Sequence, residues 1–370
     1  MRIGILTLPL HTNYGGILQA YALQTVLERM GHEVVVLDRP FHRKGLSIKK
    51  KITYYPKRFI KRYILFRKNV RILQEEYVER VQPIVEQNTK LFIDKYIHIR
   101  TVNNINAISD KEFDAIVVGS DQIWRPTPHQ NIYDAYLEFA LTWNIKKIAY
   151  AVSFGTDCWE YSKQETNKCN ELAKQFDGIS VREESGIGLC SKFLNVESEL
   201  VLDPTLLLDK NDYMELINSR VTKDSHFLLV YILDMTEEKQ RLVDKISKEK
   251  NLIPLVVNSK VENLQAELNE RIQPPVENWI QGFCDADFVI TDSFHACAFS
   301  IIFNKPFIVY GNASRGLARF KSLLSIFNLS NRFITSTNDY KAMPDINFDE
   351  VNRIMNKYRE KSMSFLSKML

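Results

Sequence analysis

Short runs of apolar residues alternate along the chain with longer segments whose apolar residues recur every three or four positions. The short runs, rich in β-branched and aromatic residues, predict buried strands, and the longer segments predict helices with one apolar face. Strands that alternate with helices from one end of a chain to the other are typical of parallel sheets covered by helices. The pattern therefore predicts an α/β protein.

The predicted strands form two series. The first comprises Ile3–Leu6, Val34–Leu37, Ala115–Val118, Ile148–Val152, Ile179–Val181 and Leu200–Leu202, and the second comprises Phe227–Leu233, Ile253–Val257, Phe288–Ile290 and Phe307–Tyr310. A turn at Asp203–Thr205 and the polar stretch Asp209–Asp212 lie between them. We therefore expect two Rossmann-like domains, residues 1–205 and 206–345, with parallel sheets facing a shared cleft, followed by an amphipathic helix over 346–370.

The region between the second and third predicted strands, about residues 40–110, is predicted to be an insertion with its own helix. Twelve lysines and arginines and no acidic residue lie between Arg43 and Arg71, interleaved with aromatic and aliphatic residues. Residues 43–71 can lie on an anionic membrane surface, or they can form a solvated helix whose apolar face packs on its own domain. Nucleic acid is not expected as a partner, because no DNA- or RNA-binding motif accompanies the charge.

The composition agrees with a globular protein of two domains. A chain of 370 residues exceeds the size at which single cores usually stop growing. No apolar run approaches the roughly 18 residues of a membrane span, and the amino end lacks the layout of a signal peptide, so we expect a cytoplasmic protein. Five scattered cysteines lack the spacing of a zinc site or a disulfide framework, and no metal site is predicted.

A polar turn follows the predicted strand at Phe288–Ile290. Its residues Thr291–Ser293 can cap the helix that follows, and His295 stands in the first turn of that helix. Free amides, the helix dipole and His295 could together hold an anionic ligand. In the alternative interpretation, the polar residues are only caps and His295 is satisfied by neighbouring backbone.

A second turn follows the first predicted strand. Asn13, Gly15 and Gly16 allow a tight turn and a close approach of the backbone to a ligand at the start of the next helix. The spacing lacks the fingerprint of dinucleotide-binding proteins. The alternative is that Asn13 simply caps the helix.

A third turn, Gly119–Pro126, combines an aromatic ring with carboxylate, amide and guanidinium groups. Such a mixture suits a sugar, whose apolar face can stack on Trp124 while its hydroxyls meet Asp121 and Gln122. Ser153 ends the next strand and is expected on the same rim. In the alternative interpretation, Trp124 belongs to the core and Asp121 is only a turn residue.

Two cationic positions also follow predicted strands. Arg182 stands at the end of Ile179–Val181, where its planar guanidinium can clamp a phosphate or a carboxylate, or instead form a surface salt bridge. Gly311–Gly316 includes Asn312 and Arg315, and the helix after it carries Arg319. Polar groups at successive strand ends favour a ligand site in the cleft.

Together these motifs resemble the polysaccharide pyruvyl transferase family. The resemblance spans about residues 1–330 and rests on Asn13–Gly16, Leu18–Leu23, Gly119–Trp124, Ser180–Glu183, Asp203–Pro204 and Thr291–His295. It implies two Rossmann-like domains in the GT-B-like arrangement. It also implies transfer of pyruvate from phosphoenolpyruvate to a sugar as a ketal, during the synthesis of exopolysaccharide, capsule or cell-wall glycan.

The expected site has two halves. On the donor side we expect Arg182, Asp292, Ser293, Phe294, His295, Asn312, Arg315 and Arg319, and on the acceptor side Asn13, Tyr14, Gly15, Gly16, Asp121, Gln122, Trp124 and Ser153. His295, as acid, base or phosphate ligand, and Arg182 are expected to be essential. Phosphoenolpyruvate is the donor substrate, no cofactor or metal is demanded, and the sugar acceptor can be lipid-linked.

One position departs from the family pattern. Many members carry Arg-Leu-His where this chain has Ser293-Phe294-His295, and that arginine is implicated in binding phosphoenolpyruvate. Either another cation such as Arg315 substitutes for it, or the chain uses a different donor or acceptor. The alternatives for function are a nucleotide-sugar glycosyltransferase of the same architecture and a sugar- or phosphate-binding relative without turnover.

Overall fold

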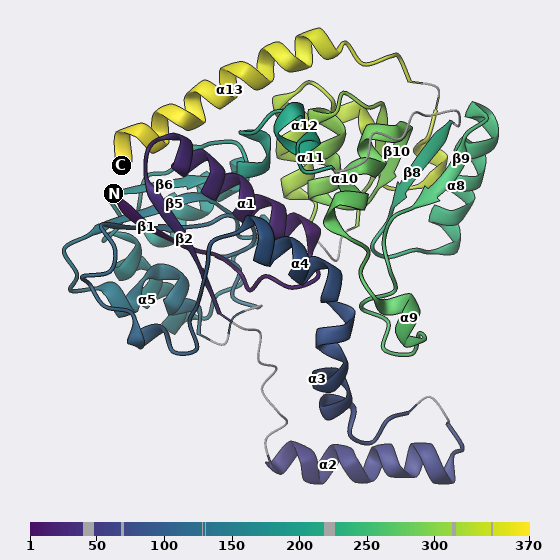
Figure 1. Ribbon diagram of the computed structural model, residues 1–370, viewed down its shortest axis with the longest axis horizontal. Coiled ribbons are helices and arrows are strands. Elements are labelled where there is room, and N and C mark those ends of the chain that lie inside the picture. The colour runs from purple at the N-terminus through teal and green to yellow at the C-terminus, as the bar shows by residue number, and fades with distance from the viewer. Residues whose placement is uncertain are drawn as a thin grey trace.

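The computed structural model describes residues 1–39, 48–67, 70–127, 129, 131–217, 226–312, 316–341 and 343–370. Within these residues the strands form two parallel sheets flanked by helices, one sheet in each half of the molecule (Figure 1). The alternation of apolar strands and amphipathic helices along the chain produces this arrangement. The predicted class, α/β with two Rossmann-like sheets, is confirmed.

The N-terminal sheet has the strand order β3-β2-β1-β4-β5-β6-β7, with every pair parallel. Its strands are β1 (Arg2–Leu6), β2 (Glu33–Asp38), β3 (Ile99–Thr101), β4 (Ala115–Val118), β5 (Lys146–Val152), β6 (Gly178–Val181) and β7 (Glu199–Leu200). The first six strands follow the order of the Rossmann fold. Strand β3 was not predicted from the sequence.

The C-terminal sheet has the order β12-β11-β10-β8-β9 and is also parallel throughout. Its strands are β8 (Phe227–Tyr231), β9 (Ile253–Val256), β10 (Ala286–Thr291), β11 (Phe307–Tyr310) and β12 (Phe333–Ile334). This is the order of the other common doubly wound fold, read from the opposite edge. Strand β12 was likewise not predicted.

Helices cover both sheets. They are α1 (Tyr14–Arg29), α2 (Ile48–Phe59), α3 (Gln74–Val85), α4 (Gln87–Tyr96), α5 (Lys163–Ala173), α6 (Glu184–Leu189), α7 (Lys210–Met214), α8 (Glu237–Lys250), α9 (Leu268–Arg271), α10 (Val276–Asp285), α11 (Phe294–Ile302), α12 (Ala318–Ile326) and α13 (Phe348–Met369). None of the described helices is long and apolar enough to cross a bilayer.

Each sheet has a point at which its strand order reverses. In the N-terminal sheet this point lies between β1 and β4, which pair in register from Ile3 with Ala115 to Leu6 with Val118. In the C-terminal sheet it lies between β8 and β10, where Tyr231 pairs with Thr291. Open α/β sheets bind ligands beyond the carboxyl ends of strands at such points. Three of the polar turns described above follow strands at these points, namely β1, β4 and β10.

The two domains share one continuous core. Tyr14, at the start of α1, is fully buried against two aromatic residues of the other domain, with ring centroids 5.5 Å from Trp279 and 6.2 Å from Tyr231. Its hydroxyl donates to the carbonyl of Pro274 at 2.7 Å. Burial of large aromatic rings across the junction, worth roughly 1.5–3 kcal/mol per side chain, favours a fixed relation between the domains.

Helix α13 returns from the C-terminal domain to the N-terminal sheet, so that both chain ends lie close together (Figure 1). The Ser362 hydroxyl accepts from the amide of Leu202 at 3.0 Å, and Lys146 donates to the carbonyl of Met369 at 2.7 Å. The helix therefore ties the end of the second domain to the first.

The region predicted to be an insertion contains α2, α3, α4 and β3, and α2 projects away from both domains (Figure 1). A π-helical turn, η1 (Ile60–Ile64), continues α2. Helices α3 and α4 connect this projection to the body of the protein.

Candidate functional site

A cleft of about 890 Å³ opens between the two sheets. Its walls are the turns after β1 (residues 11–13), β4 (Asp121, Gln122 and Arg125), β8 (residues 231–235), β9 (residues 258–263) and β10 (residues 292–295), together with Gln273, Arg319 and Phe320. Both switch points thus contribute to one cavity, as expected from the positions of the polar turns.

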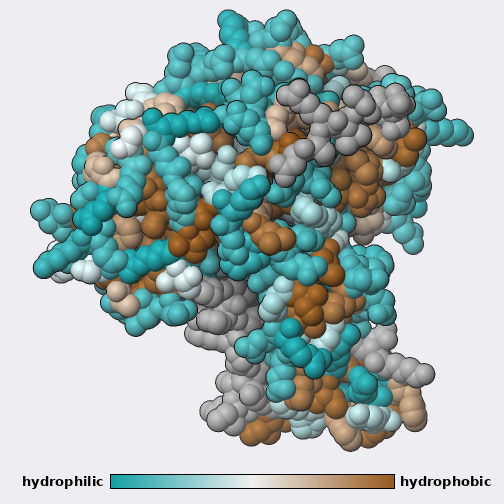
Figure 2. All heavy atoms as spheres, in the orientation of Figure 1, coloured by the Kyte–Doolittle hydropathy of each residue, from teal (hydrophilic) through white to brown (hydrophobic). Residues whose placement is uncertain are grey.

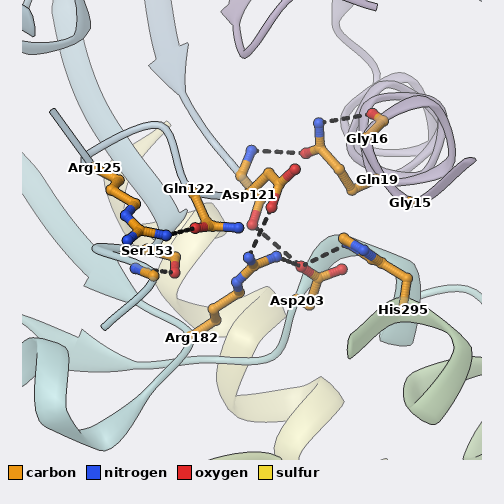
Figure 3. Close-up of polar contacts among 12 residues, drawn as sticks. Gly15, Gly16, Gln19, Asp121, Gln122, Arg125, Ser153, Arg182, Asp203 and His295 are labelled. Carbon is orange, nitrogen blue, oxygen red and sulfur yellow. Dashed lines mark hydrogen bonds and ion pairs between the residues drawn. The ribbon is translucent and has the colours of Figure 1, made fainter. Parts of the chain in front are cut away.

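His295 lies at the start of α11, where the two domains meet. Its side chain is only 7% exposed, and its Nε2 atom lies 3.8 Å from Oδ2 of Asp203 (Figure 3). Burial lowers the pKa of His295 below its ordinary value, although the carboxylates of Asp203 and Asp121 act in the opposite direction. The imidazole is therefore neutral near pH 7 and able to accept a proton.

Gly15, in the first turn of α1, packs directly against the ring of His295. A methyl group added at this glycine would overlap Nδ1, Cγ and Cε1 of the imidazole. The glycine is required here by the close approach of two helix starts, one from each domain. The close approach that Gly15 allows is therefore to His295, whereas the predicted approach was to a ligand, and it fixes where the histidine can stand.

Arg182 lies behind the cleft and not in it. Its side chain has no exposed surface, and it donates to Asp203 at 2.6 Å and to Asp121 at 2.9 Å (Figure 3). The predicted clamping of a phosphate or carboxylate by Arg182 is therefore wrong for this structure, because its guanidinium is enclosed by protein carboxylates. Arg182 is a positioning residue for the two acids nearest to His295.

The charges of this cluster hold both aspartates ionised. Burial raises the pKa of Asp121, but the charges of Arg182, of His295 once it is protonated at low pH, and of Arg319 outweigh it and set that pKa at about 2. Burial likewise raises the pKa of Asp203, and Arg182 and His295 reverse the effect. Two carboxylates consequently lie near the imidazole on the N-terminal side.

A buried hydrogen-bond network links this cluster to α1. The side-chain oxygen of Gln19 accepts from the amide of Ser120 at 2.7 Å, and its NH2 group donates to Thr7 at 2.8 Å. The Ser120 hydroxyl lies 3.3 Å from Oδ2 of Asp203. The turn after β4 is therefore fixed relative to α1 from behind the cleft.

Asp292 has a structural task. Its carboxylate accepts from the amides of Leu233 at 2.6 Å and Asp234 at 3.2 Å, and from the ammonium of Lys239 at 2.7 Å. These bonds join the turns after β8 and β10. The predicted contact of the Asp292 carboxylate with the donor is corrected accordingly, since its oxygens already hold the neighbouring turn.

The start of α11 is not capped by its own side chains. Ser293 occupies the N-cap position without a side-chain capping bond, while Thr291 accepts from the amide of Ser293 and donates to the carbonyl of Tyr231. The interpretation of this turn as a set of caps is therefore wrong. An anion at this helix start would meet backbone amides and the positive end of the helix dipole.

Arg319 is the predicted donor-side cation that does line the cleft. Its guanidinium is buried and lies 5.7 Å from the ring centroid of Phe294. Burial and the charge of Arg182 lower the pKa of Arg319 to about 10, so it stays charged at neutral pH. A cation thus stands beside the start of α11, although position 293 is a serine.

Three residues of the predicted acceptor side line the cleft: Asn13, Asp121 and Gln122. Asn13 also caps α1 by accepting from the amide of Gly15 at 3.1 Å, so the capping interpretation holds for this residue. Gln122 accepts from Arg125 at 3.2 Å, and Arg125 is paired with Glu160. These polar groups lie across the cleft from α11.

Three others are buried outside the cleft, which corrects their predicted contact with a sugar. Trp124 has no exposed surface, stacks on Tyr136 at 4.5 Å and donates to the carbonyl of Ala135. Tyr14 belongs to the core between the domains, and the Ser153 hydroxyl accepts from the amide of Gly155 at 3.0 Å. Gly16 faces the side chain of its own N-cap and not the cleft.

The turn after β11 is described only in part. Asn312 donates to the side chain of Asp234 at 2.6 Å and so supports a residue that lines the cleft. The prediction for Arg315 lies outside the described residues. No role in the site is assigned to it here from geometry.

Sequence reasoning missed Asp203 as a site residue and treated Asp203–Thr205 as a boundary between domains. The structure places its carboxylate between Arg182 and His295 (Figure 3). The signal was present, because Asp203 directly follows the predicted strand Leu200–Leu202, as the other polar turns follow theirs. Lys239, which holds Asp292, had no such signal, since it lies inside a helix.

The chain matches a known family over most of its length. The family model described as "Polysaccharide pyruvyl transferase" matches residues 13–314. This range includes α1, the turn after β4, Arg182, Asp203 and the start of α11. No curated protein sequence shows significant similarity to the chain.

Solved structures with similar folds are distant in sequence. The Arabidopsis thaliana protein UGT89C1, complexed with UDP, is 12% identical, with coverage of 98% of this chain and 95% of that chain and a TM-score of 0.46. MurG of Acinetobacter baumannii is 12% identical, with coverage of 100% and 93% and a TM-score of 0.41. UDP-GlcNAc 2-epimerase of Neisseria meningitidis is 10% identical, with coverage of 98% and 94% and a TM-score of 0.48.

Proposed function

Because the chain belongs to the polysaccharide pyruvyl transferase family, we propose that it transfers pyruvate from phosphoenolpyruvate to two hydroxyls of a sugar as a ketal. One observation on this chain supports the proposal directly. A neutral, buried histidine stands at an uncapped helix start in the cleft, next to an ionised aspartate and a buried arginine. The site therefore combines a base, His295, with a helix start and an arginine that are suited to a small anion such as phosphoenolpyruvate.

The phosphate of the donor is assigned to the start of α11. Backbone amides there lack a side-chain cap, and Arg319 lies beside them with a charge at neutral pH. We propose that Arg319 supplies the positive charge that many family members have in an arginine where this chain has Ser293. Its planar guanidinium can hold a phosphate or carboxylate through paired hydrogen bonds.

The chemistry requires two protons to be added, one to the methylene carbon and one to the departing phosphate, and two to be removed from sugar hydroxyls. The methylene carbon of phosphoenolpyruvate gains a proton, and a sugar hydroxyl attacks C2 and loses its own proton. The C2–O bond to phosphate then breaks, with its electron pair leaving on the phosphate. A second hydroxyl closes the ketal and gives up its proton, so that the products are the ketal and phosphate.

His295 is the group placed to move these protons. Its neutral imidazole accepts the hydroxyl proton, and Asp203, 3.8 Å away, stabilises the imidazolium that forms. The same imidazolium can then return the proton to the donor or to the departing phosphate. General acid–base catalysis of this kind contributes about a hundredfold to ten-thousandfold in rate.

We place the acceptor on the N-terminal side, against Asn13, Asp121 and Gln122, which line the wall facing α11. Carboxylate and amide groups are suited to sugar hydroxyls. The proposed acceptor is carried on a lipid and belongs to an exopolysaccharide, capsule or cell-wall glycan, with the reaction on the cytoplasmic face of the membrane. The reaction needs no metal and no redox cofactor.

Incubation with phosphoenolpyruvate and a panel of nucleotide-linked and lipid-linked sugars tests the proposal. The expected result is release of phosphate together with an acceptor whose mass has increased by one pyruvyl unit. Consumption of a nucleotide sugar without phosphoenolpyruvate would instead identify a glycosyltransferase. Binding of sugars without any product would identify a binding protein, and either of these results would contradict the proposal.

A further inference from the structure

The segment formed by α2 and η1 exposes an unusual number of large apolar side chains. Those exposed by more than half of their surface include Ile52 (69%), Phe59 (51%), Tyr63 (54%), Ile64 (61%), Leu65 (56%) and Phe66 (81%). They do not pack on either domain, because the segment projects away from the body of the protein (Figures 1 and 2). The sequence-based alternative of a helix packed on its own domain does not hold for them.

The same segment is positively charged throughout. Eight lysines and arginines and no acidic residue lie between Ile48 and Arg67. Lys57, Lys61 and Arg67 are exposed, whereas Arg58 is anchored to α3 through Glu75, 2.8 Å from both of its terminal nitrogens. We call residues 52–67 the docking surface. It presents exposed cations and exposed apolar groups side by side, on a segment held by Arg58 and by Arg62, which donates to the carbonyl of Val70 at 2.9 Å.

We propose that the docking surface binds the surface of an anionic lipid bilayer. Helices that combine a strongly cationic face with aromatic and aliphatic side chains lie in the interface of membranes, with the apolar groups below the headgroups. Both features are then satisfied at once, since the headgroups supply negative charge and the acyl chains take up Ile52, Phe59 and Phe66.

Other partners match only one of the two features. A nucleic acid neutralises the cations but offers no apolar interior to the six exposed apolar side chains. A second copy of this chain could cover the apolar groups, but it would bring two sets of cations together without any acidic residue between them. The bilayer is therefore the partner that the surface favours.

The docking surface is connected to the cleft. Arg71, at the foot of α3, donates to the carbonyl of Leu264 at 2.6 Å, and Asn88 of α4 donates to the carbonyl of Gln273 at 2.8 Å. Gln273 and Asn263 line the cleft. If the proposed function holds, the lipid of the acceptor stays in the bilayer to which the protein is docked. The sugar then enters the cleft from the side lined by residues 258–263 and Gln273.

Vesicle flotation tests the docking without any need for activity. The full chain is mixed with vesicles of phosphatidylcholine with or without phosphatidylglycerol. We expect flotation only with phosphatidylglycerol, and loss of it at high salt, because screening weakens the attraction to the headgroups. Absence of flotation with the anionic vesicles, or equal flotation with both kinds, would overturn the proposal.

Two pairs of variants locate the contact. Lys57→Gln with Lys61→Gln should weaken binding about 30-fold, whereas Lys163→Gln with Lys174→Gln, on exposed positions of α5, should leave it unchanged. Ile52→Ser should weaken it about tenfold, and Leu91→Ser, at the same 69% exposure on α4, should not. Equal effects within either pair would overturn the assignment to residues 52–67.

Two further readouts separate the rival partners and the proposed function. Sedimentation that shows a dimer dependent on Ile52, or tighter binding to duplex DNA than to anionic vesicles, would overturn the proposal. The Lys57→Gln, Lys61→Gln variant should convert a water-soluble acceptor at the wild-type rate and lose activity only on acceptors in anionic vesicles. Failure of pyruvyl transfer in every variant would count against the function and would leave the flotation result standing.

Discussion

The protonation states in the cleft depend on a few buried contacts of single residues. His295 is kept neutral by burial, while Asp121 and Asp203 are kept ionised by Arg182. A neutral base next to ionised carboxylates is the arrangement that a proton-accepting histidine requires. The catalytic role assigned to His295 therefore depends in part on Arg182 and Asp203, which do not line the cleft.

Replacement of the proposed base tests its role. His295→Gln should lower kcat/KM for pyruvyl transfer about a hundredfold to ten-thousandfold, because the glutamine amide cannot take the hydroxyl proton. His226→Gln, at an exposed histidine paired with Asp287, is the matched control and should retain wild-type activity. A His295→Gln protein that melts normally and turns over at the wild-type rate would contradict the assignment.

The pH dependence has a definite sign. Because the neutral form is the active one and burial lowers the pKa of His295 from 6.5, kcat/KM should fall only as the pH drops below 6.5. The Asp121 carboxylate raises that pKa, so Asp121→Asn should shift the acid limb to still lower pH. Asp110→Asn, on the surface, should leave the limb in place. An acid limb above pH 6.5, or an upward shift in Asp121→Asn, would be inconsistent with a buried neutral base.

Arg182 should matter for stability as well as for activity. Arg182→Met leaves the carboxylates of Asp121, Asp203 and Glu183 buried without their cation, which should cost about 3–5 kcal/mol in the free energy of unfolding. Arg353→Met removes a 77% exposed partner of Glu350 and should cost about 0–1 kcal/mol. Urea denaturation measures both, and equal losses would contradict the role given to Arg182.

Single residues also mark the limits of sequence reasoning. The polar turns predicted where the cleft lies. The sequence could not show which residues of each turn point into the cleft and which point into the core. Trp124 and Asp121 are three positions apart, and one is core while the other lines the cavity. Likewise, an arginine at a strand end can reach a ligand or a neighbouring carboxylate, and only the position of Asp203 decides between them for Arg182.

At the scale of elements, the site is formed by two helix starts from different domains. Helices α1 and α11 approach so closely that only glycine fits at position 15 beside the imidazole. This contact joins residues 280 positions apart in the chain and was invisible in the sequence, where the glycines indicated only a tight turn. The strands were easier to predict, since each central strand is a buried apolar run.

Gly15→Ala tests the contact between these helices. The new methyl group should displace His295 from Asp203 and reduce kcat about a hundredfold, although alanine is the better helix former. Gly188→Ala, in α6, meets no atom within 4 Å and should leave activity unchanged. Normal turnover in Gly15→Ala would mean that His295 does not need its present position.

The two strands missed by the sequence are short. β3 has three residues and β12 has two, and both lie at the edge of their sheets. Segments of this length carry no readable alternation of apolar and polar positions, and pairing with a neighbouring strand determines their conformation. The central strands next to the switch points have continuous apolar runs, so the place of the site could be predicted even though the edge strands β3 and β12 could not.

At the scale of the whole molecule, two sheets with different strand orders direct both of their switch points into one cleft. The aromatic core around Tyr14 and the return of α13 to the N-terminal sheet hold the halves together. The projecting docking surface leads into α3, and Arg71, which lies between the two, contacts the carbonyl of Leu264 next to the cleft-lining residues 258–263. The proposed donor site, acceptor wall and membrane contact are thus arranged on one chain.

The central claim is that phosphoenolpyruvate gives up its enol-pyruvyl group to a sugar in this cleft with a proton added to its methylene carbon. The most direct measurement is the reaction in D2O with phosphoenolpyruvate and a sugar acceptor, followed by NMR of the ketal methyl group and assay of phosphate. The account predicts a methyl group that carries a single deuterium, and one phosphate for every ketal formed. A sugar product without the three-carbon unit, or phosphate release without a ketal, would contradict it.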